Sequence, residues 1–188
     1  DRVASRGLGD VYKRQDDRLL SFVDLAPSVL QMAGIEIPEY MQGKPINEIL
    51  HKSLRDYLIT ASDRFDGQYD RIRAIQDNRF KLIRSFYLDM SHHLDVQYRK
   101  NMPMMQKLLS LHLDGRLNQD QQKWFGRKEE YEFYDLQKDP YEMKNQIQNP
   151  AYQDHIQLLK VELEKWMLNT NDLGAVPEQV LIKQATSQ

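Results

Sequence analysis

The chain has 188 residues, 40% of them hydrophobic, which is enough to bury the core of one ordinary domain. Its 26 lysines and arginines nearly balance its 28 aspartates and glutamates, and the formal net charge of −2 gives no global field that would favour nucleic acid or a membrane surface. The absence of cysteine excludes disulfide bonds, thiolate metal sites and a cysteine nucleophile within these residues.

The first sixteen residues differ in character from the rest of the chain. The stretch from Asp1 to Gln15 has two glycines, six charged residues and no sustained helical or strand period. It lacks the hydrophobic core of a signal peptide and resembles a translated sequencing-adapter peptide. We expect residues 1–16 to be a non-native or disordered leader, with an ordinary surface loop as the alternative.

The next segment predicts a capped helix followed by a tight loop. Ser21 is a candidate N-cap with Asp24 at the third helical position, where a carboxylate favours the positive helix end. Gly34 stands where a glycine commonly ends a helix. The expected apolar face consists of Phe22, Val23, Leu25, Val29, Leu30 and Met32.

Four segments further along the chain have strand character. The first is the short apolar run from Tyr57 to Ser62. Two alternating segments, residues 70–77 and 79–86, flank a turn-prone Asp-Asn pair and predict a hairpin. Residues 132–136 predict the fourth strand, closed by a turn at Asp139-Pro140.

The remaining periodic segments predict helices. Apolar residues recur at helical spacing over residues 98–112 and 150–168, and Asn118 can cap a shorter helix that runs through Trp124. Residues 171–188 are polar, and we expect them to form an extended tail. Strands interleaved with helices and joined by short turns predict an α+β fold, in which a small antiparallel sheet has helices packed against it.

Three motifs, taken in order along the chain, resemble the sulfatase family. The string VDLAPSVLQMAGIEIP at residues 23–38, followed by MQGK, resembles the family's junction between catalytic domain and C-terminal subdomain. The strand pair RAIQDNRFKLIRSF and the string EFYDLQKDPYEMKN, which ends at Asn145, resemble the subdomain itself. In the last string we expect Asp139-Pro140 to nucleate a turn, Glu142 to receive backbone N–H groups and Asn145 to end the turn.

The resemblance implies a C-terminal piece of an alkaline-phosphatase-like α/β sulfatase. Residues 17–56 would be the end of the catalytic domain and residues 57–170 the C-terminal subdomain. Such enzymes use a formylglycine made from a Cys/Ser-x-Pro-x-Arg motif and a calcium or similar divalent cation. The chain has no cysteine, and none of its seven prolines has a serine two residues before it. We therefore expect it to hold neither cofactor and to be inactive alone.

The best candidates for substrate binding are Asp63 and Arg64, in an expected loop over residues 62–69. In the resembled family this loop lines the substrate cleft, and the glucosamine N-sulfatase branch carries histidines near these two positions. Arg64 could bind a sulfate or carboxylate in fork geometry, and Asp63 could accept sugar hydroxyls. The alternative is an internal Asp63–Arg64 ion pair that holds the loop.

Other charged clusters have simpler explanations than a site. Asp16-Asp17 could suggest paired metal aspartates, but they lie at the junction with the expected leader, without the surrounding strand of the resembled family. The adjacent His92 and His93 point in different directions with no third ligand evident, and we expect them to be solvated. The basic residues of the predicted hairpin could mimic a nucleic-acid-binding surface, but acidic neighbours favour solvated strand faces. They are Arg71, Arg73, Arg79, Lys81 and Arg84.

The resemblance implies that the intact parent hydrolyses sulfate esters or sulfamates on sulfated carbohydrate. The insert between Met90 and Trp124 points to the heparan N-sulfatase-like branch. The alternatives are a phosphodiesterase or phosphonate hydrolase of the same superfamily, and a non-catalytic module that binds a glycan or a partner. We expect a periplasmic or secreted parent, no nucleic-acid partner, no membrane span, and an exposed apolar patch around Phe22.

Overall fold

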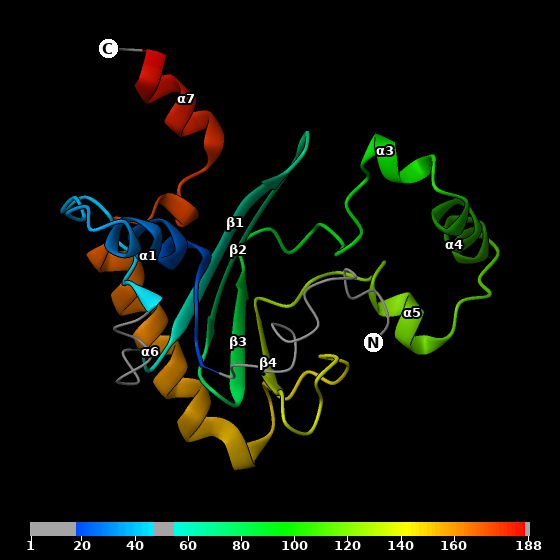
Figure 1. The fold of residues 1–188 in the computed structure, drawn as a ribbon. Helices are drawn as coiled ribbons and strands as arrows, with labels where there is room; N and C mark the ends of the chain where they lie inside the picture. Colours follow the sequence, from blue (N-terminus) through cyan, green and yellow to red (C-terminus); the bar gives the residue numbers. More distant parts are fainter. Residues whose placement is uncertain (1–17, 47–54, 187–188) are drawn as a thin grey trace, which may run out of the picture. The chain divides into compact units, whose positions relative to one another are not determined.

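The computed structural model describes residues 18–46 and 55–186 (Figure 1). The chain divides into two compact units, Asp1–Leu58 and Ile59–Gln188. The expected leader and the Asp16-Asp17 pair lie outside the described residues.

The first unit contains the capped helix that the sequence predicts. A 3₁₀ turn, η2 (Phe22–Asp24), leads directly into α1 (Leu25–Met32). The backbone N–H of Ser21 donates to Asp24 Oδ2 at 2.8 Å, as in a capping box. Gly34 ends the helix at φ 68°, in the left-handed region that glycine adopts without a Cβ penalty. The predicted helix is confirmed, although its first turn is 3₁₀.

The carboxylate of Asp24 joins the start of this helix to the MQGK loop. It is fully buried, accepts from the Lys44 backbone N–H at 2.9 Å, and forms an ion pair with both terminal nitrogens of Arg55. Burial would raise the pKa of Asp24, but the hydrogen bonds from Arg55, Lys44 and Ser21 outweigh burial and lower this pKa below its usual range. The aspartate of the first motif therefore has a structural role.

Gly43 lies where the MQGK loop approaches η2 too closely for a side chain. A Cβ on Gly43 would lie 1.9 Å from the carbonyl oxygen of Val23. We therefore expect Gly43→Ala to push the loop away, break the Lys44–Asp24 hydrogen bond and destabilise the first unit by about 2 kcal/mol. Amide hydrogen exchange measured by NMR should show faster exchange at Lys44.

The matched control for this prediction is Gly67→Ala. A Cβ on Gly67 meets no atom within 4 Å, so its replacement should leave Lys44 exchange unchanged. Equal protection of Lys44 in the wild-type chain and the Gly43→Ala variant would show that the loop accommodates the methyl group.

An apolar face on η2 and α1 remains exposed, as the sequence predicts. Phe22 is 89% exposed and Met32 69%. Contiguous apolar surface of this kind marks a contact site for another part of a protein or for another chain. The exposed residues are Phe22, Val23, Leu25, Val29 and Met32.

The second unit is built on a four-stranded sheet in the order β1-β2-β3-β4 (Figure 1). The strands β2–β3 and β3–β4 pair antiparallel, with Ile75 opposite Leu82 and Leu82 opposite Phe133. The four predicted strands, the hairpin between the second and third, and the α+β class are confirmed. The bounds are β1 (Leu58–Phe65), β2 (Gln68–Gln76), β3 (Phe80–Ser85) and β4 (Tyr131–Asp135).

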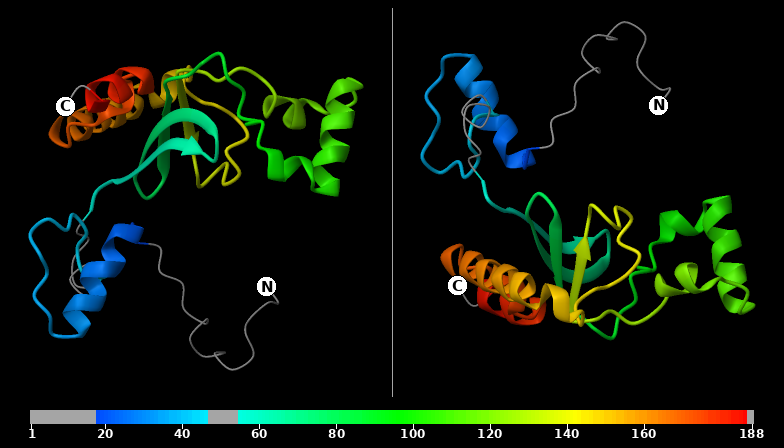
Figure 2. Two further views of the ribbon diagram at one scale, coloured as in Figure 1. Left: turned by 90° about the horizontal axis from the view of Figure 1, so that it is seen from above. Right: turned by 90° about the horizontal axis from the view of Figure 1, so that it is seen from below.

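One face of the sheet packs against α6 (Gln153–Asn169), which follows the 3₁₀ turn η3 (Pro150–Tyr152). Figure 2 shows α6 lying along the sheet in two further views. Because side chains alternate along a strand, the same strands present polar residues on their other face. The fully buried side chains of this core include Ile75, Leu82, Phe133, Leu159 and Leu163.

Three short helices lie between β3 and β4, a stretch that the structure describes throughout. They are α3 (Gln97–Lys100), α4 (Pro103–Leu113) and α5 (Gln119–Lys123). The helical segment predicted over residues 98–112 is confirmed for most of its length, but it is divided into α3 and α4, because Pro103 has no N–H to continue the hydrogen-bond ladder and starts a new helix. The predicted cap at Asn118 is confirmed, since its Oδ1 accepts from the Gln121 N–H at 2.9 Å.

The C-terminal segment is not the extended tail predicted for residues 171–188. It contains the 3₁₀ turn η4 (Leu173–Ala175) and the helix α7 (Glu178–Thr186). Pro177 precedes α7, and the carboxylate of Glu178 lies in its first turn, where it suits the helix dipole. The polar composition that suggested an extended chain is that of a short surface helix.

Candidate functional site

Asp63 and Arg64 lie near the end of β1 and not on a loop. The loop predicted over residues 62–69 is wrong, since β1 runs to Phe65 and β2 begins at Gln68. The two-residue connection is made by Asp66, at φ 56°, and Gly67. The last three residues of β1, 63–65, escaped prediction as strand because their exposed side chains show no hydrophobic alternation.

Each candidate residue has a different partner. Asp63 Oδ1 lies 2.9 Å from Arg73 Nη2, on the neighbouring strand β2. The guanidinium of Arg64 forms a fork with the carboxylate of Glu178 in α7, with nitrogen–oxygen distances of 2.6 and 2.7 Å. The alternative prediction, an ion pair between Asp63 and Arg64, is therefore wrong. Asp63 pairs with a residue of β2, and Arg64 pairs with a residue of α7.

Arg73 is the buried centre of this region. It is 2% exposed, and its guanidinium binds both carboxylate oxygens of Asp172 at 2.8 and 2.9 Å in addition to Asp63. Burial would lower the pKa of Arg73, but the hydrogen bonds to Asp172 and Asp63 outweigh burial and raise it. Arg71, also buried, donates to the carbonyl oxygens of Leu173 and Gly174. The prediction of solvated strand faces is wrong at these two arginines.

Hydrogen bonds from three arginines of the β1–β2 hairpin hold segment 172–178 in place. The three are Arg64, Arg71 and Arg73. Arg64 is the accessible member, since its side chain is half-exposed. A sulfate or carboxylate presents the same pair of oxygens that Glu178 presents now.

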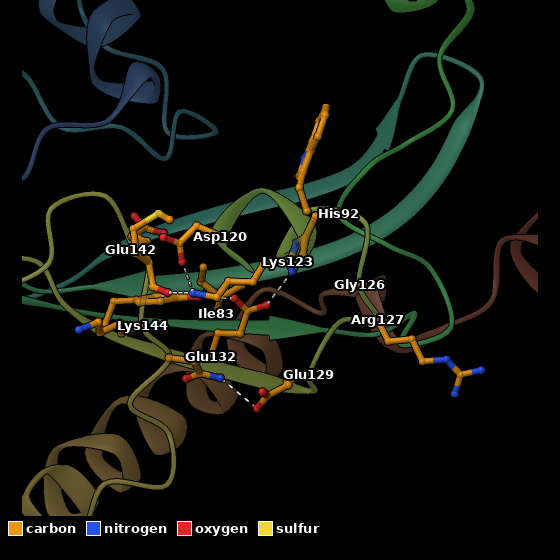
Figure 3. Close-up of a pocket in the computed structure, with 14 residues that line it drawn as sticks. Ile83, His92, Asp120, Lys123, Gly126, Arg127, Glu129, Glu132, Glu142 and Lys144 are labelled. Carbon is orange, nitrogen blue, oxygen red and sulfur yellow. Dashed lines mark hydrogen bonds and ion pairs between the residues drawn. The ribbon is translucent and has the colours of Figure 1, made fainter. Parts of the chain in front are cut away.

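A cavity of about 760 Å³ opens on the sheet face opposite α6 (Figure 3). Its floor is formed by Ile83 of β3 and by Glu132 and Tyr134 of β4. The walls come from α5 with the residues that follow it, from residues 142–145 and from His92. A cavity of this size can hold a small ligand.

The floor of this cavity carries a buried carboxylate. Glu132 is 8% exposed, and its Oε2 accepts from the Tyr134 hydroxyl at 2.5 Å. Burial, together with this hydrogen bond, raises the pKa of Tyr134 well above its ordinary value, so the hydroxyl keeps its proton and donates. The other oxygen, Oε1, lies 3.4 Å from His92 Nε2, a contact drawn as a dashed line in Figure 3, and it accepts no hydrogen bond from the described residues.

The turn that follows β4 in the string EFYDLQKDPYEMKN, from Asp139 to Asn145, acts structurally, as the sequence predicts. Asn145 Oδ1 accepts from the backbone N–H groups of Phe133 and Ile147, which secures the return of the chain onto β4. The role predicted for Glu142 is wrong, because its carboxylate binds Lys81 Nζ at 2.8 Å. Asp139 accepts the backbone N–H of Lys144 instead.

Neither histidine of the His92-His93 pair is simply solvated, so that prediction is wrong. His92 lies beside Glu132, and His93 packs against the rings of Trp124 and Phe125 at 4.9 and 5.1 Å. Burial lowers the pKa of His93. The two side chains contact different neighbours, because adjacent residues of an extended chain point in opposite directions.

Asp135, at the end of β4, is expected to make stability depend on pH. The hydrogen bond from Arg79 is the main cause that lowers the pKa of Asp135 to about 2; burial opposes it and the Tyr152 hydroxyl adds to it. Because this value lies below the unfolded pKa of about 3.9, the stabilisation is present above pH ~4 and is lost as the pH falls towards 2.

Urea unfolding at a series of pH values should therefore place the Asp135→Asn midpoint below the wild-type midpoint at pH 7. The two should converge as the pH falls towards 2. Asp89→Asn, at a carboxylate that is almost fully exposed, is the control and should follow the wild-type curve throughout. Parallel curves for Asp135→Asn and the wild-type chain would contradict the ionic role of Asp135.

The described residues do not fit the cofactors that the resemblance implies for the parent. Among residues 18–46 and 55–186, no three His, Cys, Asp or Glu side chains lie together as metal ligands would. The whole sequence has no cysteine and no Ser-x-Pro from which a formylglycine could form. Within the same ranges, no helix combines the length and apolar character needed to cross a membrane.

Comparison with known protein families identifies the family to which the chain belongs. Residues 10–110, just over half of the chain, match the family described as N-sulphoglucosamine sulphohydrolase, C-terminal. The chain belongs to this family. It is the C-terminal region of a sulfatase, and Asp63 and Arg64 lie within the matched residues.

Curated relatives extend the match beyond the family region. An ulvan-active sulfatase of Formosa agariphila is 41% identical over 170 residues, covering 90% of this chain and 28% of the relative. The human N-sulphoglucosamine sulphohydrolase is 23% identical over 191 residues, covering 90% of this chain and 36% of the human protein. The chain thus spans about a third or less of the relatives it matches.

Solved structures agree with the fold. BT1596, a 2-O GAG sulfatase, aligns with a TM-score of 0.55 at 20% identity, covering 86% of this chain and 28% of that structure. BT4656, solved with D-glucosamine-2-N,6-O-disulfate, aligns with a TM-score of 0.53 at 21% identity over 82% and 25%. This sulfatase C-terminal region therefore has the α+β fold of known sulfatase structures.

Sequence reasoning missed Arg73 and Glu132 as the centres of their clusters. The partner of Arg73, Asp172, lies 99 residues away in sequence. For Glu132 a local signal existed, because Glu132 and Tyr134 flank Phe133 and must share the strand face opposite to it. Two polar side chains at alternate positions of a buried strand predict that the sheet face opposite the apolar core is polar.

Proposed function

We propose that this chain is the C-terminal part of a sulfatase that hydrolyses sulfate esters or sulfamates on a sulfated polysaccharide. The observation that supports it is the 41% identity to an ulvan-active sulfatase over 90% of this chain, together with the family match. Ulvan is accordingly the first substrate to assay, and a glycan containing N-sulphoglucosamine the second.

In this proposal the chain contributes binding and not bond cleavage. A formylglycine and a calcium or similar divalent cation, held by other parts of a periplasmic or secreted parent, supply the hydrolytic chemistry. Residues 17–56 belong to the catalytic domain, and residues 57–170 form the C-terminal subdomain. Arg64 binds an anionic group of the polysaccharide in exchange for Glu178, and Asp63 accepts sugar hydroxyls.

The first test is the DNA upstream of the codon for Asp17. A reading frame that continues into a Cys/Ser-x-Pro-x-Arg motif, followed by sulfate release from ulvan by the encoded protein, would support the proposal. A threonine or serine nucleophile in another context would favour the phosphodiesterase alternative. A start codon directly before Asp1 would contradict the proposal and favour a non-catalytic module.

Arg64→Gln tests the binding role in the active parent protein. We expect KM for the polysaccharide to rise about tenfold, because a charged hydrogen bond is lost, with kcat on a small aryl sulfate unchanged. Glu178→Gln should lower KM, since the competing carboxylate is removed. Identical KM values for the parent and both variants would exclude Arg64 from the substrate site.

A further inference from the structure

The cavity beside β4 holds an acceptor that forms no hydrogen bond with any group in the described part of the chain. Oε1 of Glu132 is buried and accepts no hydrogen bond from the described residues; it lies 3.4 Å from His92 Nε2, while Oε2 accepts from the Tyr134 hydroxyl. A buried carboxylate oxygen without a donor is unfavourable by roughly 1–3 kcal/mol or more. A ligand that brings an O–H or N–H donor to this oxygen would remove that penalty.

The charges around the cavity are largely paired with one another. Lys123 Nζ binds Asp120 Oδ1 and the Met143 carbonyl, both at 2.8 Å, and Asn145 Nδ2 donates to Glu129 Oε2 at 3.0 Å. Figure 3 shows these pairs as dashed lines around the cavity wall. A wall whose cations and anions are paired in this way favours a neutral polar ligand over a strongly anionic one.

Apolar surface in the same cavity favours a ligand with one flat, carbon-rich face. Trp124 and Ile83 both line it, and the indole of Trp124 is half-buried against His93 and Phe125. A neutral pyranose ring matches this combination, because it carries hydroxyl donors at its rim and C–H groups on its faces. The volume of about 760 Å³ accommodates such a ring.

We propose that this cavity binds an unsulfated sugar ring, whose hydroxyl groups donate to Glu132 Oε1 and whose face packs on Trp124. The choice of a glycan ligand rests on the proposed function, whereas the site itself rests on the geometry of the cavity. The chain would thereby recognise more of a polysaccharide than the group that is hydrolysed.

The test uses the 188-residue chain and the fluorescence and indole N–H resonance of Trp124. The chain has two tryptophans, so a Trp166→Phe background leaves Trp124 as the single reporter. The probes are methyl β-D-glucopyranoside, methyl α-L-rhamnopyranoside and N-acetyl-D-glucosamine. We expect at least one to shift the Trp124 resonance in a saturable manner. No saturable shift with any of the three would overturn the proposal.

Glu132→Gln is the decisive variant. The amide oxygen of glutamine can still accept from the Tyr134 hydroxyl, but an NH2 group, which donates and does not accept, replaces the carboxylate oxygen Oε1. Its affinity for the bound probe should fall about tenfold. Glu130→Gln, at a neighbouring carboxylate that is 55% exposed and does not line the cavity, is the matched control and should bind like the parent chain. Equal affinity in both variants would overturn the assignment of Glu132, and thermal unfolding verifies that both are folded.

Failure of this proposal is distinct from failure of the proposed function. Sugar binding by this chain requires no hydrolysis, and sulfate release by the parent requires no neutral-sugar site. Probe binding without any sulfatase reading frame upstream would identify a glycan-binding module. Sulfatase activity without probe binding would retain the enzyme and remove this site.

Discussion

Replacing Arg73 with leucine is expected to destabilise the second unit by about 3 kcal/mol and to release the segment after Thr170. The guanidinium is buried between Asp63 and Asp172, and its loss leaves the carboxylate of Asp172 buried without a counter-charge. Urea unfolding followed by circular dichroism measures the loss of stability. Limited proteolysis with mass spectrometry should show new cleavage close to Asp172.

Two further variants determine whether the charge is the cause. Asp63→Asn should destabilise by less than about 1 kcal/mol, because the Asp63 side chain is 56% exposed. Combining Arg73→Leu with Asp172→Leu should be less destabilising than the sum of the single changes, since neither charge is then left unpaired. Strict additivity would contradict the pairing, and an unchanged cleavage pattern would contradict the fastening of the C-terminal segment.

Truncating Leu159 to alanine is expected to destabilise the second unit by about 3 kcal/mol. Leu159 lies on the face of α6 that packs against the sheet, and its side chain is fully buried. The substitution removes apolar contacts and leaves a cavity that a sheet-backed core closes only in part. The urea midpoint of the same chain provides the measurement.

The matched control is the adjacent residue in the same helix. Leu158 is 45% exposed, so Leu158→Ala should change stability by less than about 0.5 kcal/mol. Both substitutions replace leucine by alanine with the same helix propensity. A similar loss at the two positions would show that α6 does not pack against the sheet through Leu159.

Local elements of the fold followed from residues that are close in sequence. The cap at Ser21, the helix end at Gly34 and the hairpin across Asp77-Asn78 each depend on a few neighbouring positions. The errors have local causes as well. Pro103 divides a predicted helix, and the polar edge strand β1 lacks the alternation that marks a half-buried strand.

The candidate site was harder to predict because its residues meet across the chain. Asp63 and Arg64 were found in sequence, but their partners Arg73 and Glu178 were not. Glu178 lies 114 residues from Arg64, in a helix predicted to be extended chain. A charged residue carries no sequence signal that states which distant charge will neutralise it.

By itself, the sequence determined the α+β class, most element types and the resemblance to sulfatases. Caps, turns, strand alternation and family motifs are all properties of nearby residues, and short-range sterics and hydrogen bonding express them directly. Only the tertiary structure decided which charges are buried, as at Arg73, and which carboxylate oxygen remains unsatisfied, as at Glu132. Burial and pairing depend on how distant segments pack, because desolvation is set by everything that surrounds a group and not by its neighbours in sequence.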